Sequence, residues 1–479
     1  MPAASEVFAG LPAARPDSAD LRTSIRAMRA ADGVLAGVLD DDPTGSQAVH
    51  GVQVVTVLEE SAYQAALAGP AAACFVLTNT RSLDEPAAVE LNTLAARGLI
   101  AVAGRRGARL QFVSRGDSTL RGHVLAEVAA LQAVRREVLG SGFDAVLLIP
   151  AFLEAGRLTA ADIHWARTGA GLVPVGETEF ARDASFGYAA SDLKDFITEK
   201  ARGAIRRDDI GSISLTDIRA GGPARVRELL AGLRDGTWVV VNATEYSDLE
   251  TVACGAALAE RAGQRFLFRT GPSFVRAMTG TEPAEPLRGA QLWPGGRRPG
   301  HGLIVVGSHV GQTSRQLAVL RDRGDVTAVE LSVPAVLGGG PDAADAAARE
   351  VTAALRRSDV LLYTSRAVAA ADTPEGSLAI ARTVSAAVAR TVRLALAARP
   401  AWILAKGGIT SHDVALRGLG MRRAEVAGQL FPGLISVFRP LDALPEATGI
   451  PYVVFAGNVG DDATLAQVVA ILNESPGAP

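Results

Sequence analysis

Short apolar runs rich in β-branched residues alternate along this chain with longer Ala- and Leu-rich amphipathic stretches. This alternation is typical of β-α units that build a largely parallel sheet. The runs predict strands at 34–39, 74–77, 110–113, 145–149 and 238–241 in the first half, and at 303–306, 360–363, 402–405 and 452–455 in the second half. The predicted fold class is therefore α/β, with two α/β domains whose sheets are largely parallel.

The stretch 280–300 is rich in Pro and Gly and has neither helical nor strand periodicity. We interpret it as a linker between domains. The predicted organisation is an N-terminal extension at 1–30, a first domain at 31–279, the linker at 280–300 and a second domain at 301–475. The glycine-rich segment 338–341 is predicted to be a loop within the second domain.

Charge and cysteine content exclude several classes of protein. Lys and Arg number 48 against 51 Asp and Glu, which leaves a net charge of -3 and no overall basic field to attract nucleic acid or an anionic membrane. Cys74 and Cys254 have no metal-ligand spacing and form no disulfide framework. Neither a signal peptide nor a membrane-spanning segment is recognisable, so we expect a cytoplasmic protein. The oligomeric state is left open, with a homodimer as one option.

Three consecutive carboxylates, Asp40, Asp41 and Asp42, follow the first predicted strand, and the chain then turns at 43–45. In open α/β sheets ligands bind outside the carboxyl ends of the strands. One of these carboxylates could act as a general base toward a hydroxyl group or hold Mg²⁺. The alternative is an ordinary solvated turn with a helix cap, and this segment alone does not decide between the two.

Arginines follow the next two predicted strands. Arg81 lies after the second strand, and Arg115 and Arg121 lie after the third, where Asp117 is also found. A guanidinium group donates two parallel hydrogen bonds to a carboxylate, so these arginines suit a substrate that carries one. Taken singly, each of them is more often a surface residue than a ligand.

A polar connector broken by glycines follows the fourth predicted strand, over 150–183. Long loops of this kind are more often functional than decorative. For His164, which lies within it, the sequence favours a buried packing role over metal binding, because the histidines show no metal-ligand spacing.

Turns after three strands of the second half are suited to phosphate. They contain Ser308, the segment 406–411 and Gly457, and each precedes a predicted helix whose free N–H groups favour an anion. Thr313 and Gln316 have the spacing of a capping box at the start of the first of these helices. Neither a Walker P-loop nor a dinucleotide fingerprint is present, so the residues alone do not identify the nucleotide.

Six short motifs in this order resemble the four-carbon acid sugar kinase family, and together they span 34–472. They are Asp41-Asp42-Pro43-Thr44-Gly45, Asn79-Thr80-Arg81, Asp117-Ser118-Thr119-Leu120-Arg121-Gly122, Pro150-Ala151-Phe152 with Gly156-Arg157, Lys406-Gly407-Gly408-Ile409-Thr410 and Gly457-Asn458-Val459-Gly460. The chain departs from many relatives in three places, with Arg115 where they have Lys, His123 where they have Asn, and no Gly in the segment 160–164.

The resemblance implies that the first domain binds a sugar acid, that the second binds ATP, and that phosphate passes to the terminal hydroxyl in a cleft between the domains, with Mg²⁺ accompanying ATP. It implies Asp42 or Asp117 as the base, without a choice between them. The implied substrate contacts are Asp41 or Asp42, Arg81, and the stretch from Arg115 through Gly116 to Ser118, to which the carboxylate argument adds Arg121. The implied ATP contacts are Ser308, Gly407, Gly408, Ile409, Thr410 and Gly457.

Two other functions are weighed against the kinase. One is a sensor that binds sugar acid or nucleotide without turnover, which the intact Asp41, Asp42 and Asp117 disfavour. The other is an NAD-dependent sugar-acid dehydrogenase, which the missing dinucleotide fingerprint disfavours.

Overall fold

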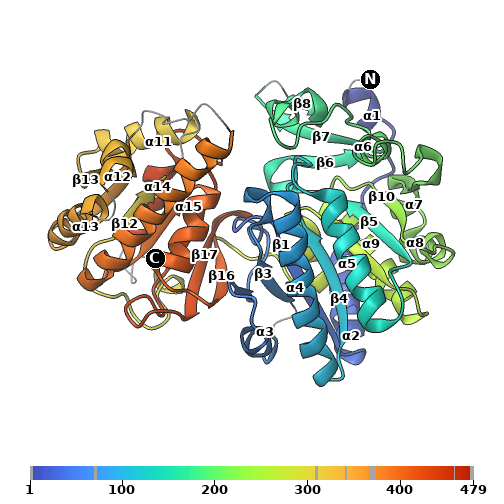
Figure 1. Ribbon diagram of the computed structural model, residues 1–479. Coiled ribbons are helices and arrows are strands. Elements are labelled where there is room, and N and C mark those ends of the chain that lie inside the picture. The colour runs from blue at the N-terminus through green and yellow to red at the C-terminus, as the bar shows by residue number, and fades with distance from the viewer. Residues whose placement is uncertain are drawn as a thin grey trace. The chain divides into compact units, whose positions relative to one another are not determined.

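The computed structural model describes residues 4–69, 73–169, 171–307, 311–339, 342–365, 374–457 and 459–474. The chain divides into two compact units, Met1–Pro283 and Ala284–Pro479, and each is an α/β structure (Figure 1). The strands predicted from the apolar runs are all present, with ends within two residues of the predicted ones.

Unit 1 is built on a parallel sheet with the strand order β2-β3-β1-β4-β11-β5-β10-β9. Its strands are β1 (Val34–Asp40), β2 (Val52–Val55), β3 (Ala73–Leu77), β4 (Arg109–Arg115), β5 (Ala145–Ile149), β9 (Gly211–Ile213), β10 (Thr237–Val241) and β11 (Phe266–Thr270). Every residue of β3, β5 and β11 is buried. Strands covered on both faces read as continuous apolar runs, which is why composition alone located most of them.

All helices of unit 1 except α1 and α6 fall into two groups that pack among themselves. One group is α3, α4 and α5, of which α4 and α5 cross the near face of the sheet in Figure 1, and the other is α2 with α7 to α10. The helices are α1 (Ala4–Phe8), α2 (Ser18–Ala31), α3 (Glu60–Leu67), α4 (Glu85–Arg105), α5 (Val124–Leu139), α6 (Leu193–Lys200), α7 (Leu215–Arg219), α8 (Gly222–Ala231), α9 (Tyr246–Arg261) and α10 (Pro272–Thr279).

Helix α4 is capped by Asp84, whose carboxylate accepts from the N–H of Ala87. Among the described residues it is the one helix long and apolar enough to cross a bilayer. It packs against α5 and β4, and Leu99 on its inner face is fully buried. Its apolar residues therefore serve the core of unit 1.

The connector at 150–183 is not the long loop predicted from its composition. It contains an antiparallel sheet of β6 (Arg157–Ala160), β7 (Ile163–Thr168) and β8 (Gly171–Pro174). These strands are too short and too polar for the apolar pattern to identify. Trp165 of β7 is nevertheless buried, and it packs with Leu158 and Ile163 in a small core of its own.

Unit 2 has the strand order β13-β14-β12-β15-β18-β17-β16, in which β12 to β15 and β18 pair in parallel and β16 and β17 are antiparallel. Its strands are β12 (Leu303–Val306), β13 (Val326–Leu331), β14 (Asp359–Thr364), β15 (Ile403–Lys406), β16 (Arg423–Phe431), β17 (Leu434–Asp442) and β18 (Tyr452–Phe455). Its helices are α11 (Gly311–Asp322), α12 (Val333–Gly339), α13 (Asp342–Ala354), α14 (Pro374–Ala395), α15 (Gly408–Asp413) and α16 (Thr464–Asn473).

Two segments outside the predicted domains are part of the packed units. Helix α2, within the predicted extension, buries Leu21 and Ile25 and packs against α9. Within the predicted linker, Leu292 and Trp293 lie in the core of unit 2, and the N–H of Leu287 donates to the Gln429 carbonyl at 2.7 Å. In the predicted loop at 338–341, Gly338 and Gly339 end α12, while the other two residues lie outside the described part of the chain.

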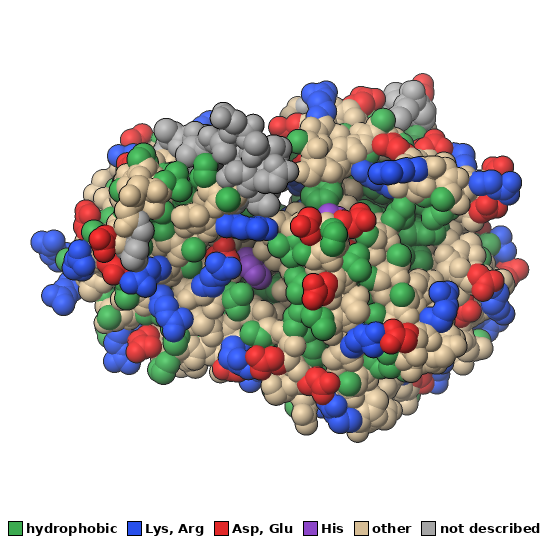
Figure 2. All heavy atoms as spheres, in the orientation of Figure 1, with side chains coloured by type: hydrophobic (Ala, Val, Ile, Leu, Met, Phe, Trp, Pro, Cys, Tyr) green, Lys and Arg blue, Asp and Glu red, His purple; other side chains and the backbone are tan. Residues whose placement is uncertain are grey.

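Charged side chains of both signs are interspersed over the face shown in Figure 2. On that face the described lysines and arginines lie among aspartates and glutamates, as the nearly balanced composition leads us to expect.

Candidate functional site

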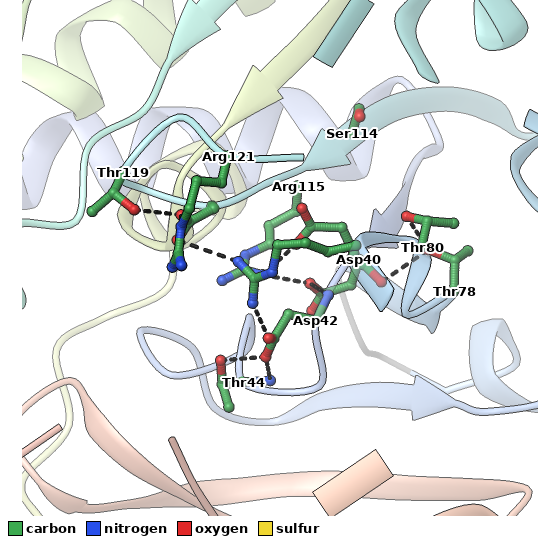
Figure 3. Close-up of polar contacts among 12 residues, drawn as sticks. Asp40, Asp42, Thr44, Thr78, Thr80, Ser114, Arg115, Thr119 and Arg121 are labelled. Carbon is green, nitrogen blue, oxygen red and sulfur yellow. Dashed lines mark hydrogen bonds and ion pairs between the residues drawn. The ribbon is translucent and has the colours of Figure 1, made fainter. Parts of the chain in front are cut away.

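The polar ends of β3, β1 and β4 lie side by side in unit 1. Asp40 is in register with Leu77 of β3 and with Arg115 of β4, so the three strands end at the same edge of the sheet. The Asp40 carbonyl accepts hydrogen bonds from the N–H groups of Thr78 and Asn79. These two bonds connect the turn after β3 to the end of β1. The three polar segments therefore meet at the edge predicted from the sequence (Figure 3).

One guanidinium group joins the two carboxylates considered for the base. Arg81 donates from Nη2 to Oδ2 of Asp42, and its Nη1 lies 3.3 Å from Oδ1 of Asp117. The other oxygen of Asp42 accepts from the N–H and the hydroxyl of Thr44, at 2.8 and 2.5 Å. Thr44 thus fixes the rotamer of Asp42 as it leaves β1 (Figure 3).

Asp117 is surrounded by donors. Its Oδ2 accepts from the Thr119 hydroxyl and, at 2.7 Å, from Nε of Arg121. Burial alone would raise the pKa of Asp117, but Arg81 and Arg121 outweigh burial and hold the pKa well below its usual range. Asp117 is therefore a firmly ionised carboxylate that orients two arginines.

Arg115 is buried between two acids. Its Nη1 lies 2.8 Å from Oδ1 of Asp40 and 3.2 Å from Oδ1 of Asp41. Burial raises the pKa of Asp40 to about 7 and also raises the pKa of Asp41, although the arginines oppose this. The second carboxylate oxygens of both acids are buried and lack a hydrogen-bond partner among the described residues. Asp41 and Arg115, predicted as substrate contacts, are thus engaged with each other inside the protein.

Gly116, another predicted substrate contact, has a packing role. A side chain there would overlap the guanidinium of Arg269. Arg269 pairs with Glu127 and donates to the Ser114 hydroxyl at 2.7 Å, and Glu127 accepts from Thr80 at 2.5 Å.

Arg269 and Glu127 are two further residues of this network that were not predicted from the sequence. Both are almost fully buried beneath the turns that follow β3 and β4. The available signal was an arginine within the apolar run of β11, since a charge in a buried strand requires a partner.

The loop after β4 is held by the small sheet and its flanking segments. The Ser118 carbonyl accepts from His164 at 2.8 Å, and the Thr119 carbonyl accepts from the Tyr188 hydroxyl at 2.6 Å. Leu120 adopts the left-handed conformation with φ of 67°, which is rare for a branched side chain and indicates a constrained loop.

His164 has the packing role predicted for it. It is fully buried, its Nδ1 lies 2.9 Å from the Thr159 hydroxyl, and burial lowers its pKa to about 4. The ring is therefore neutral, with the proton on the Nε2 that donates to Ser118.

Arg121 contacts the segment that follows β8. Besides Asp117, it approaches Asp183 with a 3.6 Å separation, and its guanidinium lies 5.2 Å from the centre of the Phe180 ring. Predicted as a carboxylate ligand, it already has two carboxylate partners in the protein.

The three turns predicted in the second half converge in unit 2, because β12, β15 and β18 are neighbours. Gly307 lies so close to Thr410 that a side chain at Gly307 would overlap the threonine hydroxyl. The Thr313 hydroxyl donates to the Gly457 carbonyl at 3.0 Å. Ser308, the remaining predicted ATP contact of the first turn, lies outside the described residues.

The capping box predicted at Thr313 and Gln316 is wrong. Helix α11 begins at Gly311, so both residues already lie within the helix. Gln316 donates instead to the carbonyls of Val459 and Asp461, at 3.1 and 2.6 Å. The spacing that suits a cap also places both side chains on one face of the helix, where they hold the turn after β18.

The second turn places two glycines, Gly407 and Gly408, directly after β15. Gly407 has φ of 108°, a conformation that disfavours any side chain, and its N–H donates to the Phe455 carbonyl. Gly408 begins α15, and the next side chain, Ile409, is 50% exposed. Thr410 is nearly buried against Gly307.

Lys406 is an unexpected feature at the end of β15. Its side chain is fully buried, its ammonium donates to the Ala456 carbonyl at 3.0 Å, and it lies 3.6 Å from the centre of the Phe455 ring. Burial lowers its pKa to about 7. This cation joins the turns after β15 and β18 from within the unit.

Among the described residues, no three His, Cys, Asp or Glu side chains group where they could hold a metal ion by themselves. Mg²⁺ in nucleotide sites is commonly bound by one or two carboxylates together with substrate phosphates and water. Asp42 and Asp117 are the carboxylates that could share Mg²⁺ with phosphates in this way, and Arg81 pairs with both of them in this structure.

Comparisons with known proteins agree with the two units. Residues 36–278 match the family of the sugar-binding N-terminal domain, and residues 303–465 match the nucleotide-binding C-terminal domain. A D-threonate kinase of Cupriavidus necator is 29% identical over 80% of this chain and 84% of its own length. A D-threonate kinase of Bordetella bronchiseptica is 27% identical over 92% of this chain and 98% of its own length.

Solved structures share the fold. A Salmonella typhimurium protein, named as a candidate tRNA synthase, has a TM-score of 0.65 at 17% identity and covers 90% of this chain and 98% of its own. A Haemophilus influenzae protein has a TM-score of 0.59 at 18% identity and covers 90% of this chain and 99% of its own. At these identities the likeness establishes the fold alone. The domain matches establish that the chain belongs to the four-carbon acid sugar kinase family.

Proposed function

We propose that this member of the four-carbon acid sugar kinase family transfers the γ-phosphate of ATP to the terminal hydroxyl of a four-carbon sugar acid. The observation that carries the proposal is Arg81 joining Asp42 and Asp117 at the carboxyl edge of the unit 1 sheet. Phosphoryl transfer depends mainly on positioning and charge neutralisation, for which a carboxylate held by arginines is suited. The two D-threonate kinases support a sugar acid as the acceptor.

Asp42 is the better candidate for the base. Asp117 receives hydrogen bonds from Arg121 and Thr119 and an ion pair from Arg81, and its lowered pKa makes it a weak proton acceptor. Asp42 has one arginine partner, and Thr44 holds its carboxylate in place. Each carboxylate oxygen has two lone pairs, so Asp42 can still accept from a substrate hydroxyl. Asp117 then orients Arg81 and Arg121 toward the developing charge.

Unit 2 would hold the nucleotide at its three converging turns. The start of α15 at Gly408 and Ile409 is partly exposed, so a phosphate could approach its backbone there, and Thr313 and Gln316 fix carbonyls of the turn after β18 toward the protein interior. When bound with ATP, Mg²⁺ would neutralise phosphate charge, and Asp42 or Asp117 is the residue suited to share it. The proposal requires both substrates to be brought together during turnover, as the family resemblance implies.

The decisive experiment follows ADP release with Mg-ATP against threonate, erythronate and 2-oxo-tetronate, with NAD⁺ reduction followed in parallel. The proposal predicts ADP release with at least one acid and no NAD⁺ reduction. Binding of acid and nucleotide without ADP release would favour the sensor, and NAD⁺ reduction would favour the dehydrogenase. Which sugar acid is the substrate is left open, and the cytoplasmic location and the homodimer are still predictions.

A further inference from the structure

Arginines gather around the carboxyl edge of the unit 1 sheet, and most of them are neutralised by the protein itself. Arg81 pairs with Asp42, Arg115 with Asp40, Arg121 with Asp117, and Arg269 with Glu127. A substrate carboxylate that approaches any of these must compete with an aspartate or glutamate already in place. Displacing a partner from a buried pair is costly, since it leaves a charge without compensation.

Arg157 is different. Among the described residues, no carboxylate lies within 4.0 Å of its guanidinium, which donates from Nη1 to the Ala155 carbonyl. Its Nε–H is buried and has no acceptor in the described part of the chain. Burial lowers the pKa of Arg157, and nearby Asp117 only partly offsets this. Arg157 is therefore a cation near Asp117 that forms no ion pair with any described residue.

The position of Arg157 is fixed. It is the first residue of β6, and its N–H and carbonyl both bond to Phe152, which closes the preceding turn. Its guanidinium lies 5.7 Å from the centre of the Phe180 ring, the same ring that Arg121 approaches at 5.2 Å. The side chain is half-buried, so a small ligand can reach part of it. Phe180 thus holds Arg157 beside the Arg121–Asp117 pair.

We propose that Arg157 binds the carboxylate of the sugar acid and so makes the site selective for acids over neutral sugars. The inference rests on the proposed function. A carboxylate is the counter-charge that Arg157 lacks among the described residues, so none of the ion pairs described above has to be broken for it to bind there. The planar guanidinium offers two parallel donors, which a lysine ammonium cannot supply.

The test compares an acid with its neutral counterpart. Steady-state kinetics are measured with threonate and with threitol, which keeps the hydroxyls but lacks the carboxylate. For Arg157→Met we expect KM for threonate to rise about 10- to 100-fold, with a smaller change in kcat and little change in kcat/KM for threitol. Arg157→Lys should fall between the wild type and Arg157→Met, because it keeps the charge but loses the fork.

A matched control lies across the same hairpin. Arg167 of β7 is exposed and packs over Gly156, without a described contact to Arg121 or Asp117. Arg167→Met removes an equal charge, so KM and kcat should stay unchanged for both threonate and threitol. An unchanged KM for threonate in Arg157→Met would overturn the inference. Equal losses for threonate and threitol would also overturn it, because they would indicate a purely structural role.

Calorimetric binding of threonate separates this inference from the proposed function. If no acid is phosphorylated but the wild type binds threonate, the kinase proposal fails while the role of Arg157 is still measured. Weaker threonate binding by Arg157→Met, with unchanged threonate binding by Arg167→Met, would then support the proposed role of Arg157. Equal affinity of wild type and Arg157→Met, or no threonate binding by the wild type, would contradict it.

Discussion

Nη1 of Arg81 lies 3.3 Å from Oδ1 of Asp117, and the same guanidinium donates from its other nitrogen to Asp42. The two carboxylates that sequence analysis could not separate are therefore parts of one network. Their surroundings differ, because Asp117 is also bound by Arg121 and Thr119, whereas Asp42 is supported by Thr44. Conservative substitutions should separate their roles.

Asp42→Asn should lower kcat by about 10²- to 10⁴-fold with little change in KM for the sugar acid, because an amide cannot accept the hydroxyl proton. Steady-state ADP release measures both constants. Asp117→Asn is the comparison variant. It loosens Arg81 and Arg121, so KM for the acid should rise and kcat should fall less than in Asp42→Asn. The reverse pattern would make Asp117 the base.

Gly116→Ala should destabilise unit 1 by about 1–3 kcal/mol, because the added methyl group overlaps the Arg269 guanidinium and strains its pairing with Glu127. Urea unfolding measures the change. Gly104→Ala is the matched control, since a side chain there meets open space on α4 and should be neutral or stabilising by up to about 1 kcal/mol. Equal effects of both substitutions would refute the packing role of Gly116.

Lys406 should make stability depend on pH in a defined direction. Burial lowers its pKa to about 7 in the folded chain, below the value of about 10.4 expected when unfolded. Between these values the unfolded chain binds more protons, so the free energy of unfolding should rise with pH, by up to about 1.4 kcal/mol per pH unit. Lys406→Met should lack this contribution.

Urea unfolding of both proteins between pH 7 and about 9.5 tests this expectation. The wild type should gain stability relative to Lys406→Met as the pH rises. Parallel pH curves would mean that the ammonium is not significantly desolvated in the folded protein.

Thr313→Val should weaken nucleotide binding, because it removes the hydroxyl that holds the Gly457 carbonyl. We expect a rise of several-fold in KM for ATP, consistent with the loss of about 1 kcal/mol for one hydrogen bond, and no change in KM for the acid. Thr383→Val is the control, because its hydroxyl bonds only within the exposed face of α14 in the described contacts. A rise in KM for the acid, with no change in KM for ATP, would contradict the proposal that these turns bind the nucleotide.

Strands and the edge where they end were predictable from sequence because a sheet covered on both faces requires continuous apolar runs, as in β5 and β12. The small sheet β6–β8 was not, since its short polar strands lack such runs. The Pro- and Gly-rich composition of 280–300 predicted a linker, but Leu292 and Trp293 of this segment belong to the core of unit 2.

Some residues of the site could likewise be predicted from the sequence, and others could not. The order of the motifs predicted that Asp42, Arg81 and Asp117 belong to one site, and in the structure Arg81 forms ion pairs with both aspartates. The residues from distant segments that contact this site could not be predicted from the spacing of motifs along the sequence. Arg269 underlies Gly116, and His164 binds the Ser118 carbonyl, so residues expected to contact substrate have contacts within the protein that only the fold reveals.

The most direct test of the central claim is ³¹P NMR of the product formed from Mg-ATP and the sugar acid that releases ADP. We predict one phosphomonoester, coupled to the two protons of the terminal carbon and equal in amount to the ADP formed, and at most about one-hundredth as much with Asp42→Asn over the same time. Inorganic phosphate as the only product, or an ester at an internal hydroxyl, would contradict transfer to the terminal hydroxyl.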